Sequence, residues 1–259
     1  MNETLNLLNQ RRSLRRFDPA PLREDEKETI LNGAMQAPSA GAMMLYSIIE
    51  VENIEKKKAL AENCDHQPFI AEAPYLLLFL ADYQRWMDYY RYCDAESVCP
   101  DFDRTPRTPT EGDFMLACMD ALIAAQNSVI AAESIGIGSC YIGDIIENYE
   151  KNRELFDLPR YTAPIALLCF GHPAEDQINR RKPERFSREY IVHTDFYHCF
   201  SDEALAKMMP DSLERRAQAI NPMARLNPGQ HNYIRKFTAP FSLEMTRSIR
   251  AILQNWKED

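Results

Sequence analysis

The spacing of hydrophobic residues near the N-terminus predicts two helices. Leu5, Leu7 and Leu8 indicate a short first helix. In residues 23–36 the acidic side chains gather in the first turn, where they suit the positive end of the helix dipole, and apolar residues recur on one face. Pro38 then ends this second helix, because proline cannot continue the hydrogen-bond ladder.

Three later segments have the composition of strands, and a fourth predicts a long helix. Residues 46–51 and 74–83 are rich in β-branched and aromatic residues, and the second run is apolar enough to be buried on both faces. Residues 163–173 indicate another buried strand. Residues 113–138 are apolar nearly all round a helix that Gly136 closes, so we expect this helix in the centre of the molecule.

The remaining segments are less regular. Residues 85–110 mix aromatic, charged and proline residues without a period, which predicts an irregular excursion of the kind that often admits substrate. From Ser201 onward the pattern is helical and charged, with breaks at three prolines. We therefore expect a main domain over residues 1–200 and a helical C-terminal extension over residues 201–259.

Composition and charge narrow the class of protein. A chain of 259 residues with 45% hydrophobic content can bury a large core. Its net charge of −9 argues against a general affinity for nucleic acid or an anionic membrane. The apolar run 75–81 is far shorter than the roughly 20 residues that cross a bilayer, so we expect a cytoplasmic protein. Seven scattered cysteines without metal-ligand spacing indicate reduced thiols rather than disulfides or a metal site.

Two basic clusters stand out in this acidic chain. The first, RRSLRRF at residues 11–17, holds four arginines, and the second, RRKPERF, occupies residues 180–186. Guanidinium groups match phosphate oxygens bidentately, and Ser13 adds a neutral donor. A solvated helix end would explain the first cluster alone equally well. The two clusters together favour a phosphate-bearing cofactor.

Other motifs are weaker or exclude a function. APSAG at residues 37–41 suits a loop against a ligand, but it is also an ordinary helix stop. GIGSCYIGD at 136–144 lacks the third glycine of the Rossmann fingerprint and follows a helix. The five histidines show no ligand spacing, and no local motif of a nucleophilic enzyme is present. No side chain is therefore assigned a catalytic role, and we expect a cofactor to carry the chemistry.

The order of RRSLRRF, APSAG, SIIEV, GIGSCYIGD and RKPERF resembles the FMN-dependent nitroreductase and flavin reductase family over roughly residues 5–195. Residues 64–86 look most similar to its longer, NADPH-dependent nitroreductase branch. The resemblance implies an α+β fold, an α/β/α sandwich around a mainly antiparallel sheet. It also implies an intertwined homodimer with two FMN molecules at the subunit interface, and NADPH or NADH as electron donor.

The resemblance assigns one group of residues to the FMN phosphate. Arg11 and Ser13 would hold the phosphate, with Arg12 beside them. Lys182 and Arg185 would close on it from the second cluster. RRKPERF has one more residue between its lysine and arginine than the usual family pattern, which leaves the alignment of that pair open.

A second group would contact the flavin ring. Arg15 would lie by N1 and O2, where negative charge gathers on reduction, and Gln67 would bond the pyrimidine edge. Ser39 would lie in the loop that lines the cofactor, and the amides of Gly143 and Asp144 would approach N5. Asp144 replaces a common glycine of the family. The resemblance also adds Tyr141 and Ile142 to the cofactor-binding residues.

These features predict an oxidoreductase that passes a hydride from NAD(P)H through FMN to small planar electron acceptors in a ping-pong reaction. Nitroaromatics, quinones and free flavins are the expected acceptors. Ala42 and Met44 stand where many members of the family carry Asn and Gln, which makes the expected pocket more hydrophobic. Reductive dehalogenation, flavin cleavage and flavin binding without turnover stay open as alternatives. A nucleic-acid module is disfavoured by the acidic total.

Overall fold

The computed structural model describes residues 2–178, 182–210 and 226–257. The chain forms two compact units: residues 1–180 together with 244–259, and residues 181–243. The first break between the units falls at residues 180 and 181, and most of the last helix belongs to the first unit. The expected domains 1–200 and 201–259 stay a prediction. The functional argument below concerns the first unit unless stated otherwise.

A four-stranded sheet forms the centre of the first unit. Its strands are β1 (Tyr46–Glu50), β2 (Tyr75–Asp82), β3 (Gly138–Ile142) and β4 (Thr162–Gly171). They pair in the order β1-β2-β4-β3, and every pair is antiparallel. β2 and β4 lie in the middle and are buried along their whole length, as their continuous apolar sequences predict. β1 and β3 form the two edges.

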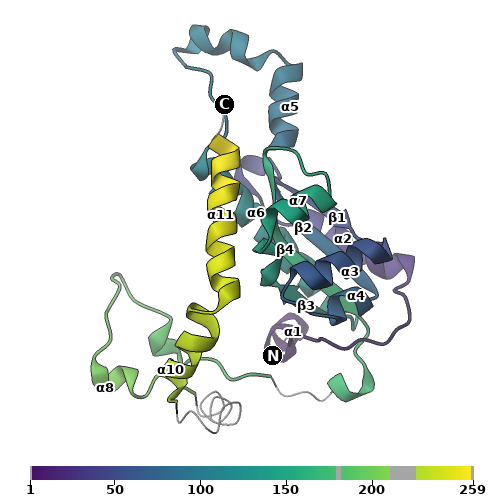
Figure 1. Cartoon of the computed structure of the whole chain (residues 1–259), viewed down its shortest axis with the longest axis vertical. Helices are drawn as coiled ribbons and strands as arrows, with labels where there is room; N and C mark the ends of the chain where they lie inside the picture. The colour runs from purple at the N-terminus through teal and green to yellow at the C-terminus, as the bar shows by residue number, and fades with distance from the viewer. Residues whose placement is uncertain (1, 179–181, 211–225, 258–259) are drawn as a thin grey trace. The chain divides into compact units, whose positions relative to one another are not determined.

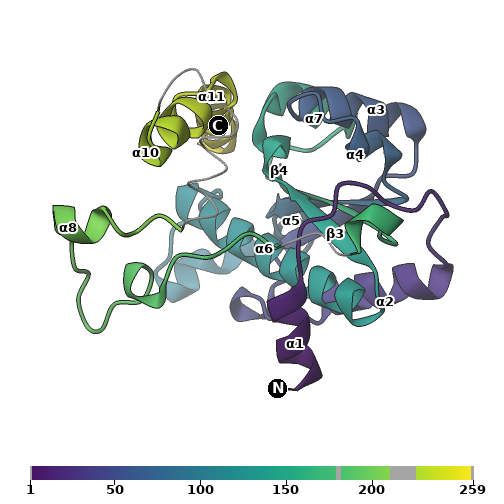
Figure 2. The same ribbon diagram turned by 90° about the horizontal axis from the view of Figure 1, so that it is seen from below.

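Helices cover both faces of this sheet, as Figures 1 and 2 show. One core joins alternate β2 residues, such as Leu77 and Phe79, to α2 (Glu24–Met35) and α6 (Glu111–Ser134). The intervening residues of β2 enter a second core beneath the other helical layer. That layer consists of α3 (Ile54–Asn63), α4 (Phe69–Glu72) and α7 (Tyr149–Leu155). This is the α+β sandwich that the resemblance to the nitroreductase family implies.

The long central helix α6 has one buried and one exposed side. A capping box between Thr110 and Asp113 starts it, and Gly136, with a positive φ of 80°, follows its end. A Cβ on Gly33 of α2 would come within 2.5 Å of Ala131 Cβ, so this glycine allows α2 to pack closely on α6. α6 is long and apolar enough to cross a membrane, but its buried residues belong to the core between α2 and the sheet.

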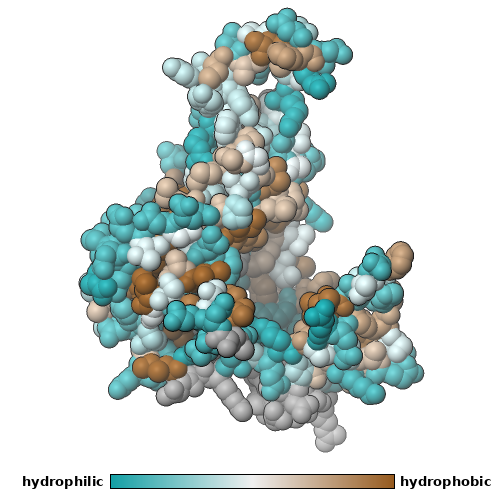
Figure 3. Space-filling model, turned by 180° about the vertical axis from the view of Figure 1, so that it is seen from behind, coloured by the Kyte–Doolittle hydropathy of each residue, from teal (hydrophilic) through white to brown (hydrophobic). Residues whose placement is uncertain are grey.

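Several apolar side chains of α6 are exposed on its other side. Counted from the first of these residues, the others follow one, four, seven and eight positions later along the chain. This spacing places all of them on one stripe of the helix. Hydrophobic residues are visible among the polar ones on the surface in Figure 3. The stripe consists of Met115, Leu116, Met119, Leu122 and Ile123. The expectation of a wholly central helix is therefore only half fulfilled.

The C-terminal helix α11 (Pro240–Lys257) completes the first core. Its Trp256 is fully buried and meets Phe114 and Tyr161 edge to face. The described part of the first unit also contains α1, α5 and four 3₁₀ turns: α1 (Glu3–Gln10), α5 (Gln84–Tyr92), η1 (Ala40–Ala42), η2 (Ala95–Phe102), η3 (Gly143–Ile146) and η4 (Glu175–Gln177). The second unit includes η5 (Arg188–Tyr190), α8 (Asp202–Leu205) and α10 (Pro228–Asn232), and Tyr190 Oη donates a hydrogen bond to Ala204 O within it.

The structure confirms the helices predicted at residues 5–8 and 23–36, the three predicted strands and the long helix. The prediction of an irregular segment at 85–110 was wrong for residues 85–92, which belong to α5, and for residues 95–102, which form a 3₁₀ turn. It is confirmed for residues 104–110, which have no regular secondary structure. β3 lies within GIGSCYIGD, where no strand was predicted. Two of the prolines that mark breaks after Ser201, Pro210 and Pro228, are described, and Pro222 lies outside the described residues.

Candidate functional site

The arginine cluster leaves α1 and runs onto the edge of the sheet. Ser13 forms a parallel bridge with Ser139 of β3, and Leu14 N donates a 2.9 Å hydrogen bond to Ser139 O. Phe17 forms an antiparallel bridge with Pro173, just beyond β4. The segment is therefore fixed at both ends by backbone pairing, in an extended form that turns successive side chains to opposite sides.

Two glycines make room for this segment. A Cβ on Gly138 would lie 2.0 Å from Leu14 Cδ1, and a Cβ on Gly171 would lie 2.8 Å from Phe17 Cδ1. Leu14 is buried, so it has little free space into which it can move. Gly138, one of the glycines of GIGSCYIGD, therefore serves the packing of the arginine segment on the sheet.

The four arginines have different surroundings. Arg16 forms a 2.7 Å ion pair with Asp176, and its side chain is 69% exposed, so it is a surface residue. Arg12 Nη2 donates to the carbonyl oxygens of Gln177, at 3.0 Å, and Ile178. Arg15 is exposed and makes no hydrogen bond or ion pair within the described residues. Arg12 and Arg16 thus bind other parts of the protein, whereas the charge of Arg15 is available to a ligand.

Arg11 and Arg12 fit an anionic ligand. The Nε atom of each is buried and has no hydrogen-bond partner among the described residues. Burial raises the pKa of Glu133 on α6, and the charges of Arg11 and Arg12 act against this rise, so both guanidinium groups lie near that one carboxyl. Arg11 and Arg12 carry two positive charges against the one carboxyl of Glu133, and their two Nε–H groups have no acceptor among the described residues. A phosphate group would supply both the negative charge and the acceptor oxygens.

Tyr141 lies beside this basic site. Burial raises the pKa of its hydroxyl to about 12, and the Arg11 charge opposes the rise. The hydroxyl therefore stays protonated at neutral pH, and it donates a 3.4 Å hydrogen bond to Gln126 Oε1. Ile142, by contrast, is buried in the second core, so only its backbone is available to a ligand.

Gln67 and Asp144, which the sequence assigns to the same cofactor, lie in contact. Gln67 Nε2 donates to Asp144 Oδ2 at 2.7 Å and to Cys64 O at 2.8 Å. Both hydrogens of its amide group are used, so its remaining polar atom, Oε1, can only accept a hydrogen bond. Next to Asp144, Gly143 is exposed, and no atom lies within 4 Å of a Cβ placed on it. A ligand can approach the backbone at this point.

Arg15 belongs to the same neighbourhood. Burial raises the pKa of the Cys169 thiol well above its usual range, with Cys140 and Cys64 contributing, and the Arg15 charge lowers it. Cys64 in turn is under the influence of Asp144. The charges of Arg15 and Asp144 therefore act on neighbouring buried thiols, and Cys64 and Cys169 are too strongly desolvated to act as nucleophiles at neutral pH.

Glu147 is a residue of this region that sequence reasoning missed. It is only 5% exposed, and its Oε1 has no hydrogen-bond partner among the described residues. Burial, followed by the nearby Asp144 carboxyl, raises the pKa of Glu147 to about 7. Its spacing of three residues from Asp144, within and just after the turn η3, was the available signal, because such a spacing places two side chains on one side of a helical turn.

Ser39 lies apart from these residues. Its Oγ accepts a 3.1 Å hydrogen bond from Met44 N, and its loop leads into β1, the edge strand opposite β3. Asp120 on α6, also missed from the sequence, holds this loop. Although it is 2% exposed, its carboxylate accepts hydrogen bonds from Ala40 N at 2.9 Å and from Leu45 N at 3.0 Å.

Lys182 and Arg185 begin the second unit. Lys182 is half-buried, and Arg185 is exposed and donates a 3.3 Å hydrogen bond to Pro183 O. Arg180 and Arg181 lie outside the described residues. A contact of the second basic cluster with the phosphate therefore stays a prediction.

Comparison with known proteins gives one family. Residues 8–172 match the nitroreductase family. The chain is 32% identical over 203 residues to an FMN reductase (NADPH) of Bacillus subtilis strain 168, a match that covers 78% of each protein. An NADPH-dependent oxidoreductase of Staphylococcus aureus strain USA300 is 30% identical over 205 residues, which cover 78% of this chain and 77% of that protein.

Solved structures agree with this result. Nitroreductase A from Vibrio parahaemolyticus superposes with a TM-score of 0.78 at 27% identity, over the whole of both chains. An NADPH:FMN oxidoreductase from Vibrio harveyi, solved with NAD+, gives a TM-score of 0.76 at 25% identity and covers 97% of this chain and 98% of that one. With more than half of its length matched, this chain belongs to the nitroreductase family.

Proposed function

We propose that this protein reduces small planar electron acceptors, such as nitroaromatics, quinones and free flavins, by a ping-pong reaction. It is an NAD(P)H-dependent FMN oxidoreductase, in keeping with its family and with the NADPH:FMN oxidoreductase and FMN reductase (NADPH) that resemble it. When bound, FMN supplies the chemistry by accepting a hydride from the nicotinamide and passing it to the acceptor. The observation that carries the proposal is the pair of buried, unpartnered guanidinium nitrogens on Arg11 and Arg12.

Each end of the proposed site has residues suited to one end of FMN. Arg11 and Arg12, with the Ser13 hydroxyl beside them, would hold the phosphate through charge-assisted hydrogen bonds. Gln67 Oε1, which can only accept, suits the N–H group of the flavin pyrimidine edge. Arg15, which has no ion-pair partner in the described chain, would stabilise negative charge on the ring.

We also propose a homodimer, with two features of one chain in support. The exposed apolar stripe of α6 needs cover. In addition, Ser39 and the Arg11 segment lie at opposite edges of the sheet, so a second subunit is needed to bring them into one site. Sedimentation of the flavin-loaded protein at micromolar concentration tests this, and a folded monomer would contradict it. A cytoplasmic location stays a prediction.

The visible spectrum of the purified protein tests the function. We expect about one noncovalent FMN per chain, released on denaturation, and loss of its colour when NADH or NADPH is added without oxygen. Protein that neither carries nor takes up FMN would refute the proposal. Protein that stays yellow with both nicotinamides would instead be a flavin-binding protein without turnover.

Arg11→Ala tests the phosphate assignment directly. The change should weaken FMN binding by about 1.5–3 kcal/mol, which is roughly a 10- to 150-fold rise in Kd, because it removes hydrogen bonds from a charged donor. Arg16→Ala is the matched control, since Arg16 is paired with Asp176 on the surface. Equal FMN affinity in the two variants would exclude Arg11 from the site.

A further inference from the structure

Two carboxyl groups lie together beside the proposed flavin ring. Asp144 directly follows Gly143, and Glu147 lies three residues further along, with its backbone N donating a 3.0 Å hydrogen bond to Asp144 O. Gln67 Nε2 donates to the Asp144 carboxylate from the loop after α3. The Asp144 side chain therefore accepts a hydrogen bond from Gln67, and a protonated Glu147 can be a second donor.

The surroundings of Glu147 favour its protonated form. The charges of three carboxyls from three elements raise the pKa of Glu147: Asp144 on η3, Asp65 after α3, and Glu244 on α11. The Cys64 thiol also lies near. Glu147 itself is nine-tenths buried, and its Oε1 has no partner among the described residues. An ionised Glu147 would be unpaired, buried and close to other negative groups.

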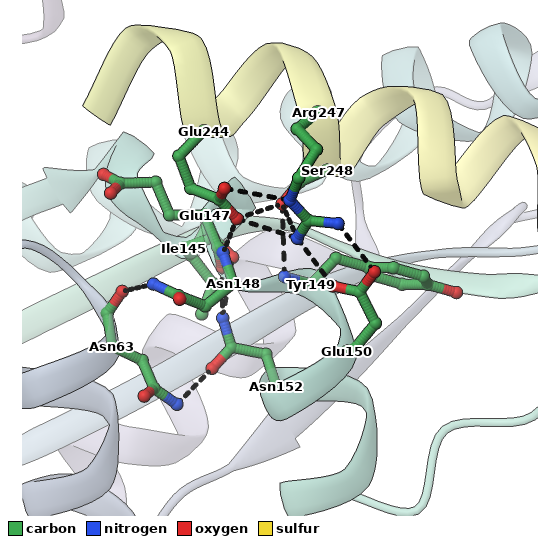
Figure 4. Close-up of polar contacts among 10 residues, drawn as sticks. All are labelled: Asn63, Ile145, Glu147, Asn148, Tyr149, Glu150, Asn152, Glu244, Arg247 and Ser248. Atoms are coloured by element: carbon green, nitrogen blue, oxygen red, sulfur yellow. Dashed lines mark hydrogen bonds and ion pairs between the residues drawn. The ribbon is translucent and has the colours of Figure 1, made fainter. Parts of the chain in front are cut away.

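Arg247, the cation that pairs with Glu244, is used elsewhere. Arg247 of α11 pairs with Glu244 at 2.8 Å and with Glu150 at 2.7 Å. Glu244 also accepts hydrogen bonds from Asn148 N and Ser248 Oγ. Figure 4 shows this network and shows the Glu147 side chain extending away from it, with no dashed line reaching its carboxyl group. Glu147 is thus excluded from the network that satisfies its neighbours.

We propose that Glu147 and Asp144 bind one proton between them at the edge of the flavin site, and that the pair holds this proton up to a higher pH when negative charge arrives on the bound cofactor. The inference rests on the proposed function. NAD(P)H delivers a hydride, which is two electrons and one proton, to FMN and leaves as the oxidised nicotinamide. At a pH where the oxidised protein has lost the shared proton, the Glu147 carboxylate accepts one proton from solvent in the same half-reaction and returns it when the acceptor removes the hydride.

The physical reason is the repulsion between like charges in a poorly solvated place. With one shared proton the pair carries a charge of −1, and without it the charge is −2. An anion beside the pair makes the second charge more costly, so the affinity of the pair for a proton rises. Glu147 would act through Asp144 and is therefore a positioning residue that sets the local charge.

The midpoint potential of the FMN-loaded protein, measured between pH 5.5 and 9, tests this inference. In the parent protein, reduction should take up one extra proton per two electrons while Glu147 titrates. This changes the reduction equilibrium constant tenfold per pH unit, or about 30 mV. Glu147→Gln, which keeps the shape but cannot titrate, should lose this added slope. Glu154→Gln, the same change at an exposed site on α7, should keep it.

Infrared difference spectra of reduced minus oxidised protein give a second readout. We expect a band from a protonated carboxyl group in the parent and in Glu154→Gln, and its absence in Glu147→Gln. If Glu147→Gln does not fold, Asp144→Asn tests the same pair, because loss of the partner charge should move the extra proton uptake to lower pH.

The outcomes separate the two proposals. Parent protein that binds FMN and is reduced by NADPH, but has the same pH slope as Glu147→Gln, would overturn the shared proton and leave the proposed function intact. Parent protein that binds no FMN would overturn both.

Discussion

Gly138→Ala tests whether the arginine segment is held on the sheet by the close approach of Leu14. The new Cβ would lie 2.0 Å from Leu14 Cδ1 and 3.0 Å from its Cγ, well inside van der Waals contact. Leu14 is 4% exposed and cannot rotate into solvent. The leucine must therefore shift, and the backbone that joins Ser13 to Ser139 must shift with it.

The expected cost follows from two opposing effects. Forcing extra volume into a packed core costs about 1–3 kcal/mol. Replacing glycine inside a strand returns roughly 0.5–1 kcal/mol, because the unfolded chain loses freedom. We expect a net loss of about 1–2 kcal/mol in the free energy of unfolding, together with weaker FMN binding, since Arg11 and Arg12 flank the displaced residues.

Urea unfolding at a fixed protein concentration measures this loss, with FMN affinity measured in parallel. Gly112→Ala is a matched control, because a Cβ there meets nothing within 4 Å and alanine favours the helix. The double variant Gly138→Ala with Leu14→Ala should be more stable than the sum of the single losses predicts, by about 1–3 kcal/mol, because the clash disappears. Strict additivity of the two changes, or an unaltered stability of Gly138→Ala, would refute the reasoning.

Three further predictions concern single charged side chains. Asp120→Asn should cost about 1–3 kcal/mol of unfolding free energy in urea titrations, because an amide can accept from only one of the two backbone N–H groups that the carboxylate now satisfies. The raised pKa of Glu147 means that the folded state holds a proton which the unfolded state has released between about pH 4.5 and 7. Stability relative to Glu147→Gln should therefore fall as pH rises through that window, by at most about 1.4 kcal/mol per pH unit, and parallel pH profiles would contradict it. Arg15→Gln should leave oxidised FMN bound within a few-fold but lower its midpoint potential by tens of millivolts, where about 30 mV corresponds to 1.4 kcal/mol, and an unchanged spectroelectrochemical titration would make Arg15 a surface residue.

The central strands were predictable from the sequence because a strand that is buried on both faces needs apolar residues at consecutive positions. Every residue of β2 and of β4 is buried, so each strand is an unbroken apolar run. β3 has no such apolar run, since it begins with Gly138 and becomes a strand by pairing with β4.

α5 was missed for another reason. Its aromatic residues, such as Trp86 and Tyr90, contact one another, and none of its residues is fully buried, so no core-facing period appears.

The arginine cluster shows how far a motif can be read without the fold. Four guanidinium groups in seven residues indicated an anion, but the extended backbone sends them to different places. Arg16 pairs on the surface, and Arg12 is partly occupied by two carbonyl groups. These partners follow β4, about 160 residues away, and local sequence contains no information about such pairings.

Buried carboxylates were also beyond sequence reasoning, although they organise the site. Asp120 and Glu147 both lie in segments where an acid on a helix or after a turn would normally be solvated. Their burial results from packing between α6 and the loop before β1 in one case, and between η3, α3 and α11 in the other. The chain has 39 aspartate and glutamate residues, and only the fold decides which of them are removed from water.

The charges at the ring end of the proposed site form a nearly balanced set. Arg15 supplies one positive charge, and Asp144 and Glu147 together supply one or two negative charges, depending on the shared proton. With the proton in place, this end is close to neutral, and Arg15 can favour reduction of the cofactor. Without the proton, the second carboxylate opposes Arg15. Asp144, which stands where the family commonly has glycine, therefore makes the effect of Arg15 depend on pH, and the protonation of Glu147 limits the cost of placing an acid beside a flavin that must accept negative charge.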